Sequence, residues 1–167
     1  MPPSGGILYM NQRIYNYSIH LLARQDYSEF KLRQKLRSKK NNSSHEVDEV
    51  LVALTARGLL KEEKYKRLFI RKWMMKGESE QKIKKRGAME KLEFESEQFR
   101  VIELELGFTD DDSIEKLIQK KLRAKEIPED FLSKNKLKDK VLRFLISKGH
   151  SFESSKRALN EFLASQS

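Results

Sequence analysis

Residues 26–40, DYSEFKLRQKLRSKK, carry a basic residue at every second position from 31 to 39. Strict alternation is typical of a β-strand, but buried faces are indicated by apolar residues rather than by charges. Leu32 and Leu36 stand four residues apart, so a helix places both leucines in one stripe. A strand would bury Gln34 and Ser38 beside them and waste half of its apolar face. The stretch therefore predicts a helix.

This predicted helix carries positive charge on both sides of its apolar stripe. Ser28 stands where an N-cap residue is needed. At about 100° per residue, Lys31 and Lys35 lie on one flank of the stripe, and Arg33 and Arg37 lie on the other. Their aliphatic stems can cover the edge of the core while their charged ends remain in water.

The apolar spacing just before this helix recurs along the chain. Ile14, Ser18 and Leu22 are spaced four residues apart. The same spacing follows 51 residues later as Tyr65, Phe69 and Trp73, and after a further 49 residues as Ile114, Ile118 and Leu122. A period of this length indicates tandem units, which stack because each is too small to bury its apolar face alone.

Each unit is predicted to contain three helices. Gly58 and Gly107 close the first and second units, and Gly149 ends the second helix of the third unit. The predicted helices are 11–25, 28–39 and 44–57, then 62–76, 79–91 and 95–106, then a helix capped by Asp110–Asp112 that ends near 125, followed by 134–148 and 152–164. The predicted fold is all-α, an elongated, curved tandem array of three three-helix repeats. Its expected parts are a flexible N-terminus (1–10) and repeats at 11–60, 61–108 and 109–167.

The composition favours a charged, cytoplasmic helical protein. Charged residues make up 36% of the 167 residues, against 7 Gly and 3 Pro, and the net charge is +10. Such a balance favours partners with negative charge, nucleic acid above all. Cys is absent, which excludes disulfides and thiolate chemistry. The N-terminus lacks the features of a signal peptide, and no apolar segment approaches the roughly 20 residues needed to cross a bilayer, so no membrane association is expected.

Charge is distributed unevenly along the chain. Residues 61–86 hold eleven Lys and Arg against four Glu, a balance of +7, whereas residues 90–115 hold two against ten Asp and Glu, a balance of −8. Basic side chains of this kind neutralise phosphates without reading sequence, and their binding is salt-sensitive. The predicted polyanion-facing patch comprises Arg71, Lys72, Lys76, Lys82, Lys84, Lys85 and Arg86, and a second patch comprises Lys31, Arg33, Lys35 and Arg37. The alternative is that these residues are merely the solvated faces of helices.

No residue pattern indicates catalysis, a metal or a cofactor. His20, His45 and His150 are scattered over different units, with no carboxylate or thiol at ligand spacing. Stacking on nucleic-acid bases is one role open to Tyr65, Phe69 and Trp73, but their position in the repeated apolar stripe favours core packing. The phosphate-binding and nucleophile motifs of common enzymes are missing.

Three stretches form a recognisable set, namely LLARQDYSEFKLRQKL (21–36), GLLKEEKYKRLFIRKW (58–73) and FLISKGHSFESSKRAL (144–159). Together they resemble the RecX family, bacterial regulators of the RecA recombinase. The resemblance implies a non-enzymatic protein of tandem three-helix repeats that lies in the groove of the RecA–DNA filament and inhibits recombinase and co-protease activity. Contact of its basic face with single- or double-stranded DNA, without sequence preference, is expected to help, and a monomer is expected.

This chain departs from the family pattern at two places. Lys31 stands where the family usually has the Glu that completes a capping box with Ser28. Arg86 and Gly87 stand where the family has Glu and Leu. The second helix of the middle repeat is therefore expected to be short or bent, and the lost leucine is expected to thin the core. Two other functions stay open, namely a general DNA- or RNA-binding protein and a helical adaptor for an acidic protein. The acidic 90–115 segment argues against a protein that only grips DNA.

Overall fold

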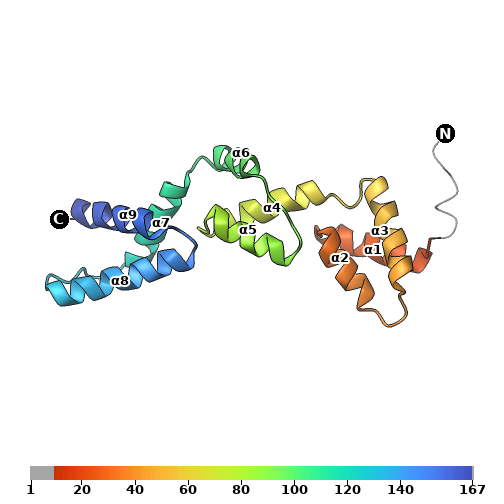
Figure 1. The fold of residues 1–167 in the computed structure, drawn as a ribbon, viewed down its shortest axis with the longest axis horizontal. Helices are drawn as coiled ribbons and strands as arrows, with labels where there is room; N and C mark the ends of the chain where they lie inside the picture. The colour runs from red at the N-terminus through yellow and green to blue at the C-terminus, as the bar shows by residue number, and fades with distance from the viewer. Residues whose placement is uncertain (1–9, 167) are drawn as a thin grey trace. The chain divides into compact units, whose positions relative to one another are not determined.

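The computed structural model describes residues 10–166, and within this range all regular structure is helical (Figure 1). Helix α2 begins at Glu29 and ends at Arg37, which confirms the helix rather than the strand for the stretch that carries alternating charge. The helices in chain order are α1 (Gln12–Arg24), α2 (Glu29–Arg37), α3 (Ser44–Ala56), α4 (Glu62–Met74), α5 (Glu80–Met89), α6 (Ser96–Leu106), α7 (Asp110–Leu122), α8 (Phe131–Ser147) and α9 (Phe152–Ser165). The all-α prediction is confirmed.

The start of α2 shows how the chain compensates for its missing capping box. Ser28 caps the helix as predicted, because its hydroxyl accepts a hydrogen bond from the Lys31 backbone N–H at 3.2 Å. Lys31 cannot return the bond. The carboxylate of Glu62 instead accepts the backbone N–H of Glu29 at 2.8 Å, which brings a negative charge to the positive end of the helix dipole.

The described residues divide into two compact units, one ending at Leu68 and the other beginning at Phe69. The boundary falls within α4. The predicted division into three repeats stays a prediction. The predicted flexible segment 1–10 lies outside the described residues except for Met10, which is buried against the core of the first unit.

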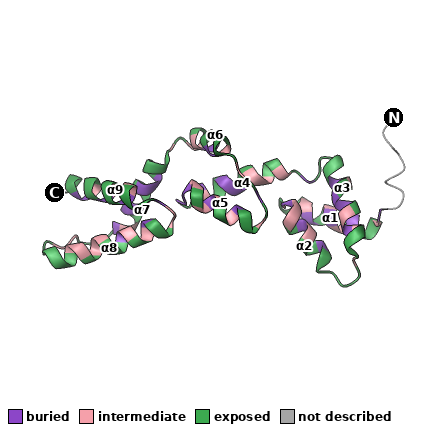
Figure 2. Ribbon diagram, in the orientation of Figure 1, coloured by how far each residue is buried: buried purple, intermediate pink, exposed green. Residues whose placement is uncertain are grey.

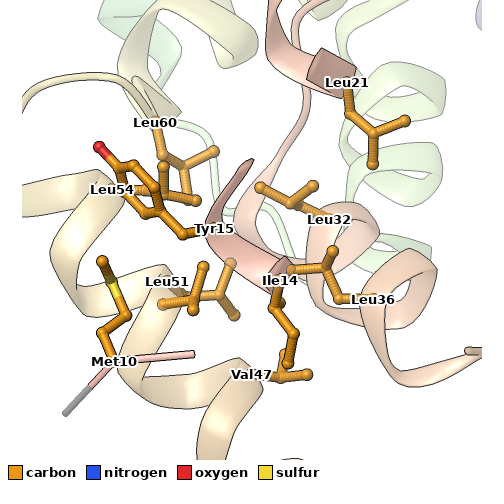
Figure 3. Packing of buried hydrophobic residues seen from close by; sticks show 11 residues of the cluster. Met10, Ile14, Tyr15, Leu21, Leu32, Leu36, Val47, Leu51, Leu54 and Leu60 are labelled. Carbon is orange, nitrogen blue, oxygen red and sulfur yellow. The ribbon is translucent and has the colours of Figure 1, made fainter. Parts of the chain in front are cut away.

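The core of the first unit joins α1, α2 and α3 (Figure 3). Leu32 and Leu36 are fully buried, as the spacing predicted, and Ile14 meets them from α1 (Figure 3). Each such side chain contributes about 1.5–3 kcal/mol when removed from water. Ser18, which occupies an apolar position of the repeat, is tolerated because its hydroxyl donates to the Ile14 carbonyl at 2.8 Å.

The second unit has an apolar core between α7, α8 and α9 and a row of aromatic rings from α4, the α5–α6 connection and α6. Purple buried positions follow the inner faces of these helices, while green exposed positions cover the outer ones (Figure 2). Phe69 stacks on Phe94 with ring centroids 5.7 Å apart, and Phe94 meets Phe99 edge to face at 5.9 Å. Phe69 and Trp73 are 6.3 Å apart. The predicted core role of Phe69 is confirmed.

Helix α5 is 10 residues long and continues through Gly87, which therefore does not break it. A Cβ atom at Gly87 would lie 2.1 Å from Cε2 of Phe94. The phenyl ring thus occupies the space that a larger side chain at position 87 would fill. The expected thinning of this core by the missing leucine is wrong, because an aromatic ring from the α5–α6 connection replaces it.

The α4–α5 and α8–α9 turns are fastened together within the second unit. Ser79 donates its backbone N–H to the Lys148 carbonyl at 3.0 Å and its hydroxyl to the Gly149 carbonyl at 2.8 Å. Gly149 has a φ of +93°, and a Cβ there would lie 2.4 Å from the Ser79 hydroxyl oxygen. Only glycine suits both the turn and this close approach.

His150 completes this junction through contacts that its neighbours in the sequence do not indicate. Its side chain is fully buried, with Nε2 2.8 Å from the Gly77 carbonyl and Nδ1 3.3 Å from Asp110. The carboxylate missing from its sequence neighbourhood is supplied by α7. Asp110 does not cap α7 as predicted, since Thr109 is the N-cap and Asp112 completes its capping box.

We expect the second unit to lose stability as the pH rises above about 6.5 and through the raised pKa of His150 in the folded protein. Burial lowers the pKa of His150 and so does the charge of Lys148, but Asp110 and the Gly77 carbonyl outweigh them and hold it above its ordinary 6.5. A raised folded pKa gives stability that is full below the unfolded value and is lost above the folded one.

The test is thermal unfolding followed by Trp73 fluorescence over a series of pH values. The unfolding temperature of the wild type should decline more steeply with pH than that of His150→Gln. His45→Gln, an exposed histidine of α3, is the control and should retain the wild-type slope. Equal slopes for His150→Gln and the wild type would contradict the role of His150.

Candidate functional site

The basic side chains of α4 lie outward because the helix buries its other face. Phe69, Ile70 and Met74 point into the core, which leaves Arg71 and Lys72 in solvent. Lys76, just past the end of α4, and Lys85, on α5, are also exposed. We call Arg71, Lys72, Lys76 and Lys85 the α4–α5 basic surface.

Trp73 lies at the centre of part of this surface. The guanidinium carbon of Arg86 is 3.9 Å from the centroid of its ring, and the ammonium groups of Lys76 and Lys72 are 4.5 and 5.3 Å away. Aromatic rings attract cations through the negative charge of their faces. Trp73 therefore gathers three basic side chains, and a nucleic-acid base could stack on it only by displacing them.

Three of the four predicted basic residues of α5 differ from Lys85 in having partners within the chain: Lys82, Lys84 and Arg86. Arg86 makes a two-point ion pair with the buried carboxylate of Glu78, at 2.5 and 2.7 Å. Burial raises the pKa of Glu78, but the Arg86 hydrogen bond and the charge of Lys82 outweigh it, so this pKa lies below its ordinary value. Arg86 thus neutralises a buried charge, a role whose loss is costly.

Lys84 and Lys82 also have partners within the chain. Lys84 pairs with Glu80 at 2.6 Å. Lys82 donates to the Ser147 carbonyl and lies 3.7 Å from Glu78. Both carboxylates precede their lysines by four residues, a spacing that favours helical ion pairs and could have been recognised in the sequence. The Glu78–Arg86 pair spans eight residues and depends on the fold.

The second predicted patch, on α2, is divided in the same way. Arg33 pairs with Glu29 at 2.6 Å and with Asp48 at 3.2 Å, and Arg37 pairs with Asp48 at 3.1 Å. Lys31 lies 5.9 Å from the centroid of the Tyr65 ring. Lys35 is exposed. The two arginines therefore serve to hold α2 against α3, while the lysines remain on the other flank.

Four of the predicted residues in the second unit form no ion pair within residues 10–166: Arg71, Lys72, Lys76 and Lys85. Their charge is available to a partner, and phosphates are the partners that lysine and arginine on an open surface most readily bind. No helix in the described part of the chain is long and apolar enough to span a membrane. Among the same residues, no three histidine or acidic side chains gather closely enough to hold a metal ion.

Comparison with known proteins gives consistent matches. Residues 15–52 match the family model for the first three-helix domain of RecX. Two proteins named regulatory protein RecX, from Haemophilus influenzae strains PittEE and KW20/Rd, are each 26% identical over 159 residues, covering 89% of this chain and 93% of their own. The crystal structure of RecX from Lactobacillus salivarius matches 90% of this chain and 94% of its own with a TM-score of 0.66 at 16% identity. That structural match shows the shared helical fold.

Proposed function

The chain belongs to the RecX family of regulatory proteins, and we propose that it is a negative modulator of the RecA recombinase. In this proposal it binds in the cytoplasm, as a monomer, along the RecA–DNA filament. Binding inhibits the recombinase and co-protease activities of the filament. The protein acts by binding rather than by catalysis.

The observation that carries this proposal is the α4–α5 basic surface. Four basic side chains remain without an ion pair in the described residues, although acidic residues are plentiful nearby in the sequence. Carboxylates instead pair with Lys84 and Arg86. The charge left over is suited to the phosphates of filament DNA, which it would bind without sequence preference.

The acidic segment favours a filament over bare DNA as the partner. Residues 90–115 carry a balance of −8, which repels phosphates but attracts basic protein surfaces. A ligand that presents both DNA and protein can engage both signs of charge. The runner-up function, a general nucleic-acid-binding protein, is favoured by the basic surface alone and leaves this segment without a role.

We expect the protein to inhibit RecA-dependent ATP hydrolysis and strand exchange at concentrations that leave bare DNA unsaturated. The test adds the protein to RecA-coated single-stranded DNA with ATP, and to the same DNA without RecA, over a series of salt concentrations. Unchanged hydrolysis and strand exchange at concentrations that saturate bare DNA would reject the modulator. That result would leave the general nucleic-acid binder in its place.

A further inference from the structure

A pocket of about 410 Å³ opens in the second unit between α5, α6, α7 and the α8–α9 turn. This volume lies within the range of about 300–1,000 Å³ that is typical of ligand sites. Its apolar walls include Phe99, which is 2% exposed, and Met74, which is 7% exposed. Its polar walls are acidic, and they include the side chains of Glu80, Glu103 and Asp110.

The carboxylates around the pocket are paired with cations of the chain in all but one case. Glu78 holds Arg86, Glu80 holds Lys84 at 2.6 Å, and Asp110 holds His150 at 3.3 Å. Glu103 has no ion pair or side-chain hydrogen bond within the described residues. One negative charge is therefore left over on the wall of this pocket.

The surroundings of Glu103 disfavour its charge. Burial raises the pKa of its carboxyl group, and repulsion from Asp110 and Glu80 raises it further, against a weaker opposing effect of Arg100. A second group in the pocket also lacks a partner. Ser113 is only 7% exposed, and its hydroxyl makes no hydrogen bond within residues 10–166. This hydroxyl lines the pocket and is not one of the fully enclosed unpaired groups of the described residues, so a guest in the pocket can hydrogen-bond to it.

We propose that this pocket is a docking site for one basic side chain, arginine or lysine, presented by a partner protein. Its charged end would donate hydrogen bonds to the Glu103 carboxylate and to the Ser113 hydroxyl oxygen, while its aliphatic stem lies against Phe99 and Met74. A nucleic acid is unsuited to the pocket because its phosphates would meet acidic walls. The inference rests on the proposed function in one respect, namely that the partner is the protein component of the filament.

The first test examines the pocket without any filament. In NMR titrations of the whole chain, N-acetyl-L-arginine amide is expected to shift the backbone amides of Phe99, Glu103 and Ser113 saturably. The citrulline analogue has the same shape without the charge and should not shift them.

Glu103→Gln should weaken arginine binding at least fivefold, and it should fold well because it removes a repelled charge. Glu115→Gln, an exposed carboxylate of α7 that contacts Gln119, is the matched control and should bind normally. Equal shifts with citrulline, or unchanged binding by Glu103→Gln, would overturn the inference.

The second test measures inhibition of strand exchange by the same two variants. Glu103→Gln is expected to need at least fivefold more protein for half-inhibition, while Glu115→Gln matches the wild type. If the wild type inhibits and Glu103→Gln inhibits equally well, the pocket does not dock on the filament and the inference fails. If the wild type does not inhibit at all, the proposed function fails, and the arginine titration alone decides whether the pocket takes a basic side chain.

Discussion

Changing Lys72, Lys76 and Lys85 together to glutamate is expected to raise the concentration for half-inhibition of RecA strand exchange by about tenfold or more. Within residues 10–166 these side chains form no ion pair. Lys72 and Lys76 contact the Trp73 ring as cations, and such exposed contacts contribute only about 0.5–1 kcal/mol each, so the variant is expected to fold. Each phosphate contact to single-stranded DNA contributes about 0.7 to the dependence of log affinity on log salt. Losing three contacts should reduce this slope by about 2. The measurements are strand exchange and filament binding over a salt series.

A charge-matched control distinguishes an effect of the α4–α5 basic surface from an effect of overall net charge. Each lysine-to-glutamate change removes two positive charges, so three changes lower the net charge from +10 to +4 wherever they are made. Lys120, Lys136 and Lys140 are exposed on α7 and α8 and offer the same alteration away from α4 and α5. Their triple variant should inhibit almost as well as the wild type. If it is impaired as much as the α4–α5 variant, overall charge rather than this surface drives binding.

The choice of lysines differs from what the sequence alone would give. By sequence, Lys82, Lys84 and Arg86 belong to the same patch as Lys72 and Lys76. The structure shows that all three contact carboxylates or carbonyls of the chain, with Arg86 serving the buried Glu78. Reversing their charge would destabilise the fold. A loss of inhibition could then come from loss of structure rather than from loss of binding. The burial of Glu78 and its pairing with Arg86 depend on tertiary packing, which no local pattern encodes.

Local signals predicted the helices well, because their determinants are close in sequence. The leucine spacing at 32 and 36, the cap at Ser28 and the terminating Gly58 each act within one or two turns. The contacts of His150 could not be predicted in this way. Gly77 and Asp110 are 73 and 40 residues away from it, and the three meet only when the turns of the second unit pack together.

The environment of Gly87 also could not be predicted from its neighbours in the sequence, and its effect on stability can be measured. The sequence presents it as a weakness, since glycine inside a helix costs roughly 1 kcal/mol relative to alanine. In the structure, the ring of Phe94 fills the space that a larger side chain at position 87 would occupy. A Cβ at position 87 would lie 2.1, 3.0 and 3.1 Å from three atoms of the Phe94 ring. Whether glycine is a defect or a requirement therefore depends on residue 94.

Gly87→Ala is accordingly expected to destabilise the second unit by about 1–2 kcal/mol, because overpacking against Phe94 outweighs the gain in helix propensity. In a Phe94→Leu background, where the ring is gone, the same substitution should instead stabilise by up to about 1 kcal/mol. Such a change of sign is the mark of two residues in direct contact. Urea unfolding followed by the fluorescence of Trp73, the single tryptophan, reports on this unit.

The control for this cycle is Ala88→Gly, a change of similar size at the next residue of α5. Ala88 is exposed. Its replacement should cost about 1 kcal/mol in both backgrounds, since only helix propensity is altered and distant or non-contacting changes add. If Gly87→Ala has the same sign with and without the Phe94 ring, the glycine is an uncompensated defect. A reversal confined to position 87 means that the aromatic ring has taken the place of the family's leucine, and that this core is repacked rather than thinned.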